Sequence, residues 1–262
     1  GRFPEISVST PSTNEPSLYA AREPIFPRRV KGQFRTLKWW LMAVLLGIYY
    51  ITPWIRWDRG PNLPDQAVLI DMANRRFFFF MIEIWPHEFY FVAGLLIMAG
   101  LGLFLFTSAA GRVWCGYACP QTVYTEMFLW IERKTEGDRS ARMRLDAQPW
   151  SLHKLSRKGA KQAGWIGLAL LTGFTFVGFF HPIRELAPAL LNPAQSPWLW
   201  FWVLFYAAAT YGNAGYLREQ VCKYMCPYAR FQSALIDMDS MVIAYDSARG
   251  ESRGPRTRKT DP

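Results

Sequence analysis

The residues best suited to chemistry in this chain are its four cysteines, Cys115, Cys119, Cys222 and Cys226. They form two copies of one motif, C-x-Y-x-C-P, in the segments "VWCGYACPQT" (113–122) and "QVCKYMCPYA" (220–229). Corresponding cysteines of the two copies are 107 residues apart in both cases. Thiolates bind zinc and iron–sulfur clusters, and paired thiols also carry out redox exchange. The motif therefore predicts metal binding or redox chemistry.

The proline after each pair indicates where a helix begins. Proline is favoured at the first helical position, so helices are predicted to start at Pro120 and Pro227, with a cysteine at each N-terminus. The positive end of a helix favours thiolate over thiol. C-x-x-x-C-P is also the closing part of the bacterial ferredoxin run that ligates iron–sulfur clusters. Four thiolates suffice for one 4Fe-4S cluster, one 2Fe-2S cluster or one tetrahedral zinc, whereas two separate redox dithiols or four inert thiols remain open alternatives.

Four stretches without Asp, Glu, Lys or Arg surround these motifs, and 51% of the 262 residues are hydrophobic. Each stretch can supply the roughly 17–25 residues of a membrane-spanning helix. We therefore predict an all-α polytopic membrane protein built as two repeats, each ending in C-x-x-x-C-P and a cytoplasmic amphipathic helix. A small periplasmic β-hairpin is predicted from residues 68–72 and 77–85. The predicted spans are residues 39–55, 89–110, 163–182 and 197–217.

The basic residues predict how such a protein is oriented. Of the 30 Lys and Arg residues, seven precede residue 39, ten lie within 112–161 and eight follow residue 217. By the positive-inside rule, both termini and all four thiols face the cytoplasm. That compartment is reducing, which argues against structural disulfides. The net charge of +10 then indicates contact with membrane lipid, and the sequence shows no nucleic-acid-binding module.

The polar ends of the chain complete the predicted domain organisation. Residues 1–26 are rich in Ser and Pro and are predicted to be a disordered cytoplasmic segment. Residues 27–240 form the predicted membrane domain with both cysteine motifs, and residues 241–262 form a polar cytoplasmic linker. The sequence has no G-x-S-x-G, H-E-x-x-H or phosphate-binding glycine loop, so no catalytic residue of those classes is predicted.

Several segments of the chain, taken in order, form a specific pattern, where a single C-x-x-x-C-P would not. They are "PRRVKGQFRTLKWW" (27–40), "PWIRWDRGPNLPDQAVLID" (53–71), "RRFFFFMIEIWP" (75–86), "GRVWCGYACPQTVYTEMFLWIER" (111–133), "EGDRSARMRLD" (136–146), "REQVCKYMCPYARFQSALID" (218–237) and "AYDSARGESRG" (244–254). In these segments the sequence resembles the CcoG/FixG/RdxA family, the accessory proteins of cbb-type cytochrome oxidases, which are membrane polyferredoxins related to NapH and NosR.

The resemblance implies an iron–sulfur electron-transfer protein of the bacterial inner membrane that helps assemble a cbb-type oxidase. It implies reduction of Cu(II) to Cu(I), with copper as substrate and oxidase subunits or copper-handling proteins as partners; the electron donor stays unidentified. The four cysteines match the family's membrane-proximal pairs and are the predicted ligands of a 4Fe-4S cluster. The family also carries a ferredoxin-like segment, toward which residues 241–262 would lead.

Two other interpretations remain open. In one, the chain is a non-redox membrane scaffold whose cysteines hold structural zinc or stay free. In the other, it is a quinol-linked electron carrier of the NapH type. Bound iron with sulfide would argue against the scaffold, and only quinol-dependent reduction would single out the carrier.

Overall fold

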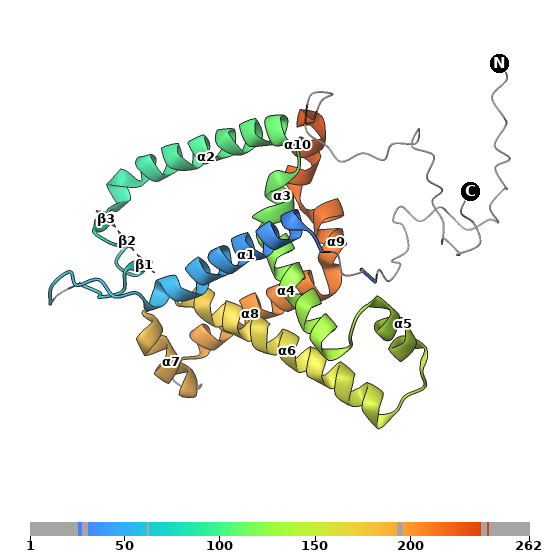
Figure 1. Cartoon of the computed structure of the whole chain (residues 1–262). Coiled ribbons are helices and arrows are strands. Elements are labelled where there is room, and N and C mark those ends of the chain that lie inside the picture. The colour runs from blue at the N-terminus through green and yellow to red at the C-terminus, as the bar shows by residue number, and fades with distance from the viewer. Residues whose placement is uncertain (1–25, 28–30, 62, 193–195, 237–239, 241–262) are drawn as a thin grey trace, which may run out of the picture.

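A computed structural model describes residues 26–27, 31–61, 63–192, 196–236 and 240 (Figure 1). The predictions for residues 1–26 and 241–262 therefore lie outside the described residues, apart from Phe26. The α-helices are α1 (Gln33–Ile51), α2 (Phe89–Ala110), α3 (Val113–Tyr117), α4 (Pro120–Thr135), α5 (Arg139–Ala147), α6 (Leu152–Val177), α7 (Ile183–Leu191), α8 (Pro197–Thr210), α9 (Arg218–Gln220) and α10 (Pro227–Leu235).

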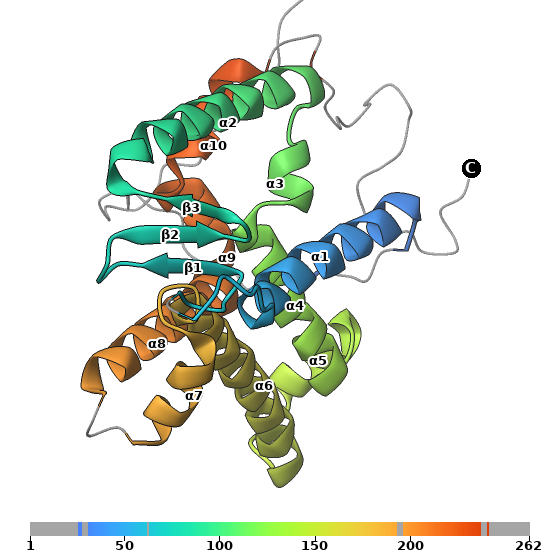
Figure 2. The ribbon, with the colours of Figure 1, turned by 90° about the vertical axis from the view of Figure 1, so that its left-hand side faces the viewer.

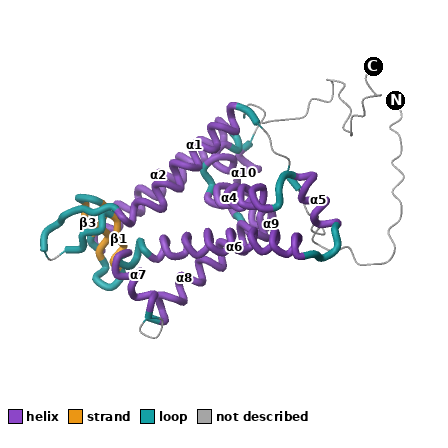
Figure 3. Tube along the Cα trace, turned by 60° about the horizontal axis from the view of Figure 1, so that its bottom comes forward, coloured by secondary structure: helices purple, strands orange, loops and turns teal. Residues whose placement is uncertain are grey.

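Shorter elements connect these helices. Two are single 3₁₀ turns, η1 (Thr52–Trp54) and η2 (Pro86–Glu88), and two are π-helical, η3 (Tyr211–Leu217) and η4 (Val221–Met225). The strands β1 (Val68–Asp71), β2 (Arg76–Phe79) and β3 (Ile82–Ile84) form an antiparallel sheet in the order β1-β2-β3. The sheet lies at one end of the molecule, and α5 lies at the other (Figure 3).

The sheet forms where the hairpin was predicted, with a third strand added. Asp71 pairs with Arg76 next to the first turn, and Phe77 pairs with Ile84 across the second. Buried Gln66 fixes the sheet to the end of α6, because its amide donates to Gly178 O at 2.7 Å and accepts from Ile183 N at 3.0 Å. Figure 2 shows the three strands side by side, with α6, α7 and α8 on one side of them.

The helical core is built around α6 and α8. Phe128 of α4 and Trp165 of α6 are buried together with small residues of α6 and α8, such as Ala169 and Ala207. Gly173 lets α6 and α8 approach closely, since a Cβ at this position would lie 2.4 Å from Val203 O. The apolar faces of these helices are thus covered mainly by one another.

Three buried carboxylates along α4 bind the surrounding helices through ion pairs. Glu126, Glu132 and Glu136 expose 7%, 4% and 3% of their side chains. A buried carboxylate persists only when cations compensate the loss of hydration. Their partners are Arg35, Lys38 and Arg133 for Glu126, Arg142 and Arg218 for Glu132, and Arg142, Lys158 and Lys161 for Glu136.

The prediction of four membrane-spanning helices is wrong. Within the described part of the chain, one helix, Pro86–Ala110, is long and apolar enough to cross a membrane. Of its α-helical part, α2, only Thr107 is buried, and its 22 residues extend about 33 Å, close to the thickness of a bilayer core.

The other three apolar stretches extend beyond the ends of their α-helices. Helix α1 ends at Ile51, α6 at Val177 and α8 at Thr210. The charge-free α-helical parts are therefore residues 39–51, 162–177 and 197–210, each shorter than the roughly 17 residues that a crossing needs. Pro53 interrupts the first stretch, and the last becomes π-helical at Tyr211. A charge-free stretch of sequence thus overestimated the length of continuous helix.

Candidate metal centre

The structure places the two cysteine motifs in related but unequal surroundings. Cys119 and Cys226 are the N-cap residues of α4 and α10, which begin at Pro120 and Pro227 as predicted. Their partners differ, because Cys115 lies in the short α-helix α3 and Cys222 in the π-helical segment η4. π-Helical turns are rare and often mark functional sites.

The fold brings the two motifs together. The Cys115 thiol of the first motif donates to Gln232 Oε1 at a distance of 3.7 Å. Gln232 lies in α10, the helix that follows the second motif in sequence. Cys115 interacts electrostatically with the other three thiols, and Cys222 interacts with Cys119 and Cys226. Residues 107 positions apart in sequence thus face one shared region.

Hydrogen bonds of two side chains, Gln121 and Arg218, join α4 to the segment before Cys222. The side-chain amide of Gln121 donates to the backbone oxygens of Asn213 and Arg218, at 2.9 and 3.2 Å. The Arg218 guanidinium in turn donates to Glu132 of α4 at 2.7 Å. We call these contacts the α4–α9 clamp, because they join the helix after the first motif to the helix before the second.

The first cysteine of each pair lies in surroundings that disfavour the thiolate. Burial raises the pKa of the Cys115 thiol above its ordinary value, and the neighbouring thiols of Cys119, Cys226 and Cys222 raise it further. Burial also raises the pKa of Cys222, and the charges of Cys119, Cys226 and Glu219 raise it further by smaller amounts. Four thiols held together repel one another once they are ionised, and a bound cation offsets this repulsion while displacing the protons.

The donor set fits an iron–sulfur cluster better than a single ion. Among the described residues, no three His, Cys, Asp or Glu side chains lie close enough to hold one metal ion. Zinc would need all its sulfur ligands about 2.3 Å from one point, whereas a four-iron cluster takes each thiolate on a different iron and spaces them more widely. Gln232, which is 5% exposed, adds a buried amide Nε2 that finds no acceptor in the described part of the chain. An unpaired buried N–H donor beside Cys115 fits a site that receives sulfur acceptors.

A pocket of about 350 Å³ lies against the second motif. Cys222 lines it together with Lys38 from α1, Thr122 from α4, and Arg218 and Glu219 from α9. Cys222 is the exposed member of the four cysteines. Solvent and small molecules therefore reach the sulfur of the second motif through this pocket.

Comparisons with known proteins agree with this assignment. A family model described as a 4Fe-4S binding domain matches residues 91–136, which include the first motif. A model described as a 4Fe-4S dicluster domain matches residues 217–261, which include the second. The cofactor is an iron–sulfur cluster.

Relatives of the chain are similar over nearly its whole length. RdxB of Cereibacter sphaeroides is 57% identical over 97% of the chain, RdxA of the same organism 58% over 92%, and FixG of Rhizobium meliloti 52% over 99%. The chain belongs to the RdxA/FixG family. It spans about half the length of these relatives, covering 53%, 51% and 49% of them. No solved structure matches the chain.

For this RdxA/FixG-family chain, reasoning from sequence singled out the cysteines as candidates and missed the residues that contact them or their segments. Gln121, Glu132, Arg218 and Gln232 carry no motif of their own. A signal existed for the charged pair, since Glu132 lies among apolar positions of a predicted helix, where an unpaired charge is costly. The contact between Gln232 and Cys115 depends on how the repeats meet, which the spacing within each motif does not show.

Proposed function

We propose that Cys115, Cys119, Cys222 and Cys226 jointly hold one 4Fe-4S cluster that carries electrons in the assembly of a cbb-type cytochrome oxidase. The observation that carries the proposal is the convergence of two distant C-x-x-x-C-P motifs on one region, with the buried Gln232 amide beside it. A cluster supplies one-electron transfer when bound. The residues of the chain hold it, order its surroundings through the α4–α9 clamp and leave the Cys222 side open.

We place this site at the cytoplasmic face of the bacterial inner membrane. Helix α2 supports membrane attachment, because its apolar surface has no packing partner along most of its length in the described structure. The first cysteine motif follows the end of α2 directly, and the basic residues concentrate around the motifs rather than in the loop that contains the sheet. Anionic lipid attracts such basic segments to the cytoplasmic leaflet.

The proposed output is reduction of Cu(II) to Cu(I), one electron per ion, with the cluster returning to its oxidised state. This step rests on the family resemblance. The described residues contain no group of three His, Cys, Asp or Glu for a resident copper ion, so copper enters the proposal as a transient substrate. Soft thiolate and thioether ligands on a receiving protein would favour the Cu(I) product.

The test is anaerobic purification of the chain in detergent, followed by iron, sulfide and zinc analysis and EPR before and after dithionite. We expect about four irons and four sulfides per chain and one reducible signal. Cys115→Ser and Cys222→Ser should each remove the same signal, because the motifs share one cluster. Met225→Leu is the matched control, since this exposed side chain lies between Cys222 and Cys226 and carries sulfur without a proposed ligand role.

Other outcomes would replace the proposal. Zinc without sulfide would indicate the structural scaffold, and partial, independent losses in the two cysteine variants would indicate two separate centres. Reduction of the cluster by a quinol, with no transfer to cupric ion, would indicate a quinol-linked carrier.

A further inference from the structure

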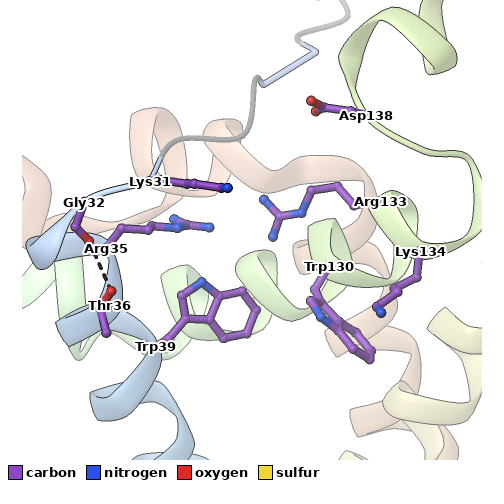
Figure 4. A pocket seen from close by; sticks show the side chains of 9 residues that line it. All are labelled: Lys31, Gly32, Arg35, Thr36, Trp39, Trp130, Arg133, Lys134 and Asp138. Carbon is purple, nitrogen blue, oxygen red and sulfur yellow. Dashed lines mark hydrogen bonds between the residues drawn. The ribbon is translucent and has the colours of Figure 1, made fainter.

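A second pocket lies between α1 and α4, apart from the cysteines. Its volume is about 760 Å³, within the range of ligand-binding pockets. Figure 4 shows Lys31 and Arg35 extending from one side toward Arg133 on the other, with Trp39 and Trp130 below them. Four of the nine lining residues are cationic, and Asp138 is the acidic one.

The charges at this pocket are not balanced. Arg35 and Arg133 both bind Glu126, which also pairs with Lys38, so three cations share one carboxylate. Each guanidinium has five N–H donors, and Glu126 occupies two of Arg35 and one of Arg133. Donors are therefore left on two arginines that already repel each other. A further anion in the pocket would accept these hydrogen bonds and lower the repulsion.

Lys31 and Lys134 add positive charge at the rim. No ion pair is recorded for either lysine in the described structure, and the Lys134 ammonium lies 5.7 Å from the Trp130 ring centroid. The Arg35 guanidinium lies 5.8 Å from the Trp39 ring in the same way. Two indoles with cations above them form an amphipathic floor, which is typical of the boundary between lipid and water.

The position of the pocket matches that boundary. Figures 1 and 2 both show the start of α1, where the pocket lies, on the same side of the molecule as the end of α2. Next to the pocket, α1 exposes Phe34 by 77% and Trp40 by 69%. An occupant can therefore place an anionic group among the cations while apolar chains cover these side chains.

We propose that this pocket binds the phosphate-bearing headgroup of an anionic phospholipid. The inference rests on the membrane attachment in the proposed function, and not on the cluster. Phosphodiester oxygens would accept from Arg35 and Arg133, Lys31 and Lys134 would provide charge at the rim, and the two indoles would pack against the glycerol region. The shared chemistry is a phosphate anion, so free phosphate and soluble nucleotides are the competing sources.

The test titrates the detergent-solubilised chain with phosphatidylglycerol, phosphatidylcholine, inorganic phosphate or adenosine diphosphate and counts bound molecules by native mass spectrometry. We expect saturable binding of one phosphatidylglycerol, at least about tenfold tighter than phosphatidylcholine, with no comparable binding of the two soluble anions. The double variant Lys31→Gln/Lys134→Gln should weaken this binding about 10- to 30-fold, since each cation near an anionic lipid contributes about fivefold or somewhat less. It leaves Glu126 and its partners intact, so the fold is preserved.

The control is Arg139→Gln/Arg144→Gln, which removes the same charge from exposed positions of α5. It should change lipid binding less than about threefold. Equal weakening in both variants would show nonspecific attraction and overturn the proposal, as would binding of either soluble anion as tightly as the lipid. Iron and sulfide measured on the same samples report separately on the cluster, so loss of one property without the other shows which proposal fails.

Discussion

Replacing Glu132 with glutamine tests whether the α4–α9 clamp holds the two cysteine motifs together. The Nη2 atoms of Arg142 and Arg218 both lie 2.7 Å from its carboxylate, and the three side chains are 4%, 7% and 19% exposed. Removing one partner of a buried ion pair costs about 3–5 kcal/mol, because the remaining charge stays desolvated. Arg142 keeps Glu136, and water partly reaches Arg218, so we expect the lower end, about 3 kcal/mol.

Thermal unfolding of the purified chain in detergent measures this loss. For a chain of this size, 1 kcal/mol corresponds to about 2–4 °C, so Glu132→Gln should lower Tm by about 6–12 °C. Asp146→Asn makes the same chemical change in an ion pair with Lys158, where the side chains are 40% and 28% exposed. Such a pair is worth about 1 kcal/mol or less. Equal shifts in Tm for the two variants would refute the argument from burial.

A second measurement separates positioning from stability. Arg218 lies four residues before Cys222, so loss of its partner should also loosen the second motif. We expect Glu132→Gln to retain less iron and sulfide than Asp146→Asn at a temperature where both variants are folded. If iron, sulfide and the EPR signal are unchanged while Tm falls, the clamp stabilises the fold without positioning the cysteines.

Three further predictions follow from single contacts. Gly173→Ala should lower the free energy of unfolding by about 1–3 kcal/mol, because the new methyl group meets the α8 backbone. At Gly167 a methyl group would have nothing within 4 Å, so Gly167→Ala should leave the stability measured by thermal unfolding unchanged or raise it by up to about 1 kcal/mol. Gln232→Leu should lower the reduction potential of the proposed cluster by about 40 mV in an EPR-monitored titration, because it removes an N–H donor to sulfur that favours the more negative, reduced state. An unchanged potential would contradict this role of the Gln232 amide. Burial raises the pKa of Glu126, but hydrogen bonds from Arg35 and Arg133 outweigh burial and hold this pKa below its ordinary value of 4.5. The ionised carboxylate therefore contributes stability above pH 4.5, and this contribution is lost as pH falls through the lowered pKa. In that pH range, Tm of the native chain should fall more steeply than Tm of Glu126→Gln.

Local sequence signals were sufficient for several elements. Proline after a cysteine correctly placed the starts of α4 and α10, because its fixed φ and missing N–H suit a first helical turn. The β-branched and aromatic residues around residues 68–84 correctly predicted paired strands. In both cases the determinants lie within a few residues of the structure that they specify.

The number of membrane-spanning helices could not be predicted in this way. Runs without charge reflect burial of any kind, and in α6 and α8 much of that burial is against another helix, as at Gly173 and Val203. The sequence also did not show where those helices end, since the change from α8 to a π-helix at Tyr211 has no proline to mark it. Helix α2 differs because its apolar side chains remain exposed, which is a property of the fold and not of composition.

The two motifs also show why matching sequence does not give matching chemistry. Cys115 and Cys222 occupy the same place in the repeat, but the first lies in an α-helix beside Gln232 and the second in a π-helical segment beside Glu219. Cys115 is partly buried, whereas Cys222 is exposed and lines a pocket. Solvent exposure and hydrogen bonds to sulfur set the potential of an iron–sulfur centre. The Cys115 side of the proposed cluster is therefore less exposed and hydrogen-bonded, and the Cys222 side is the one open to an electron donor or acceptor.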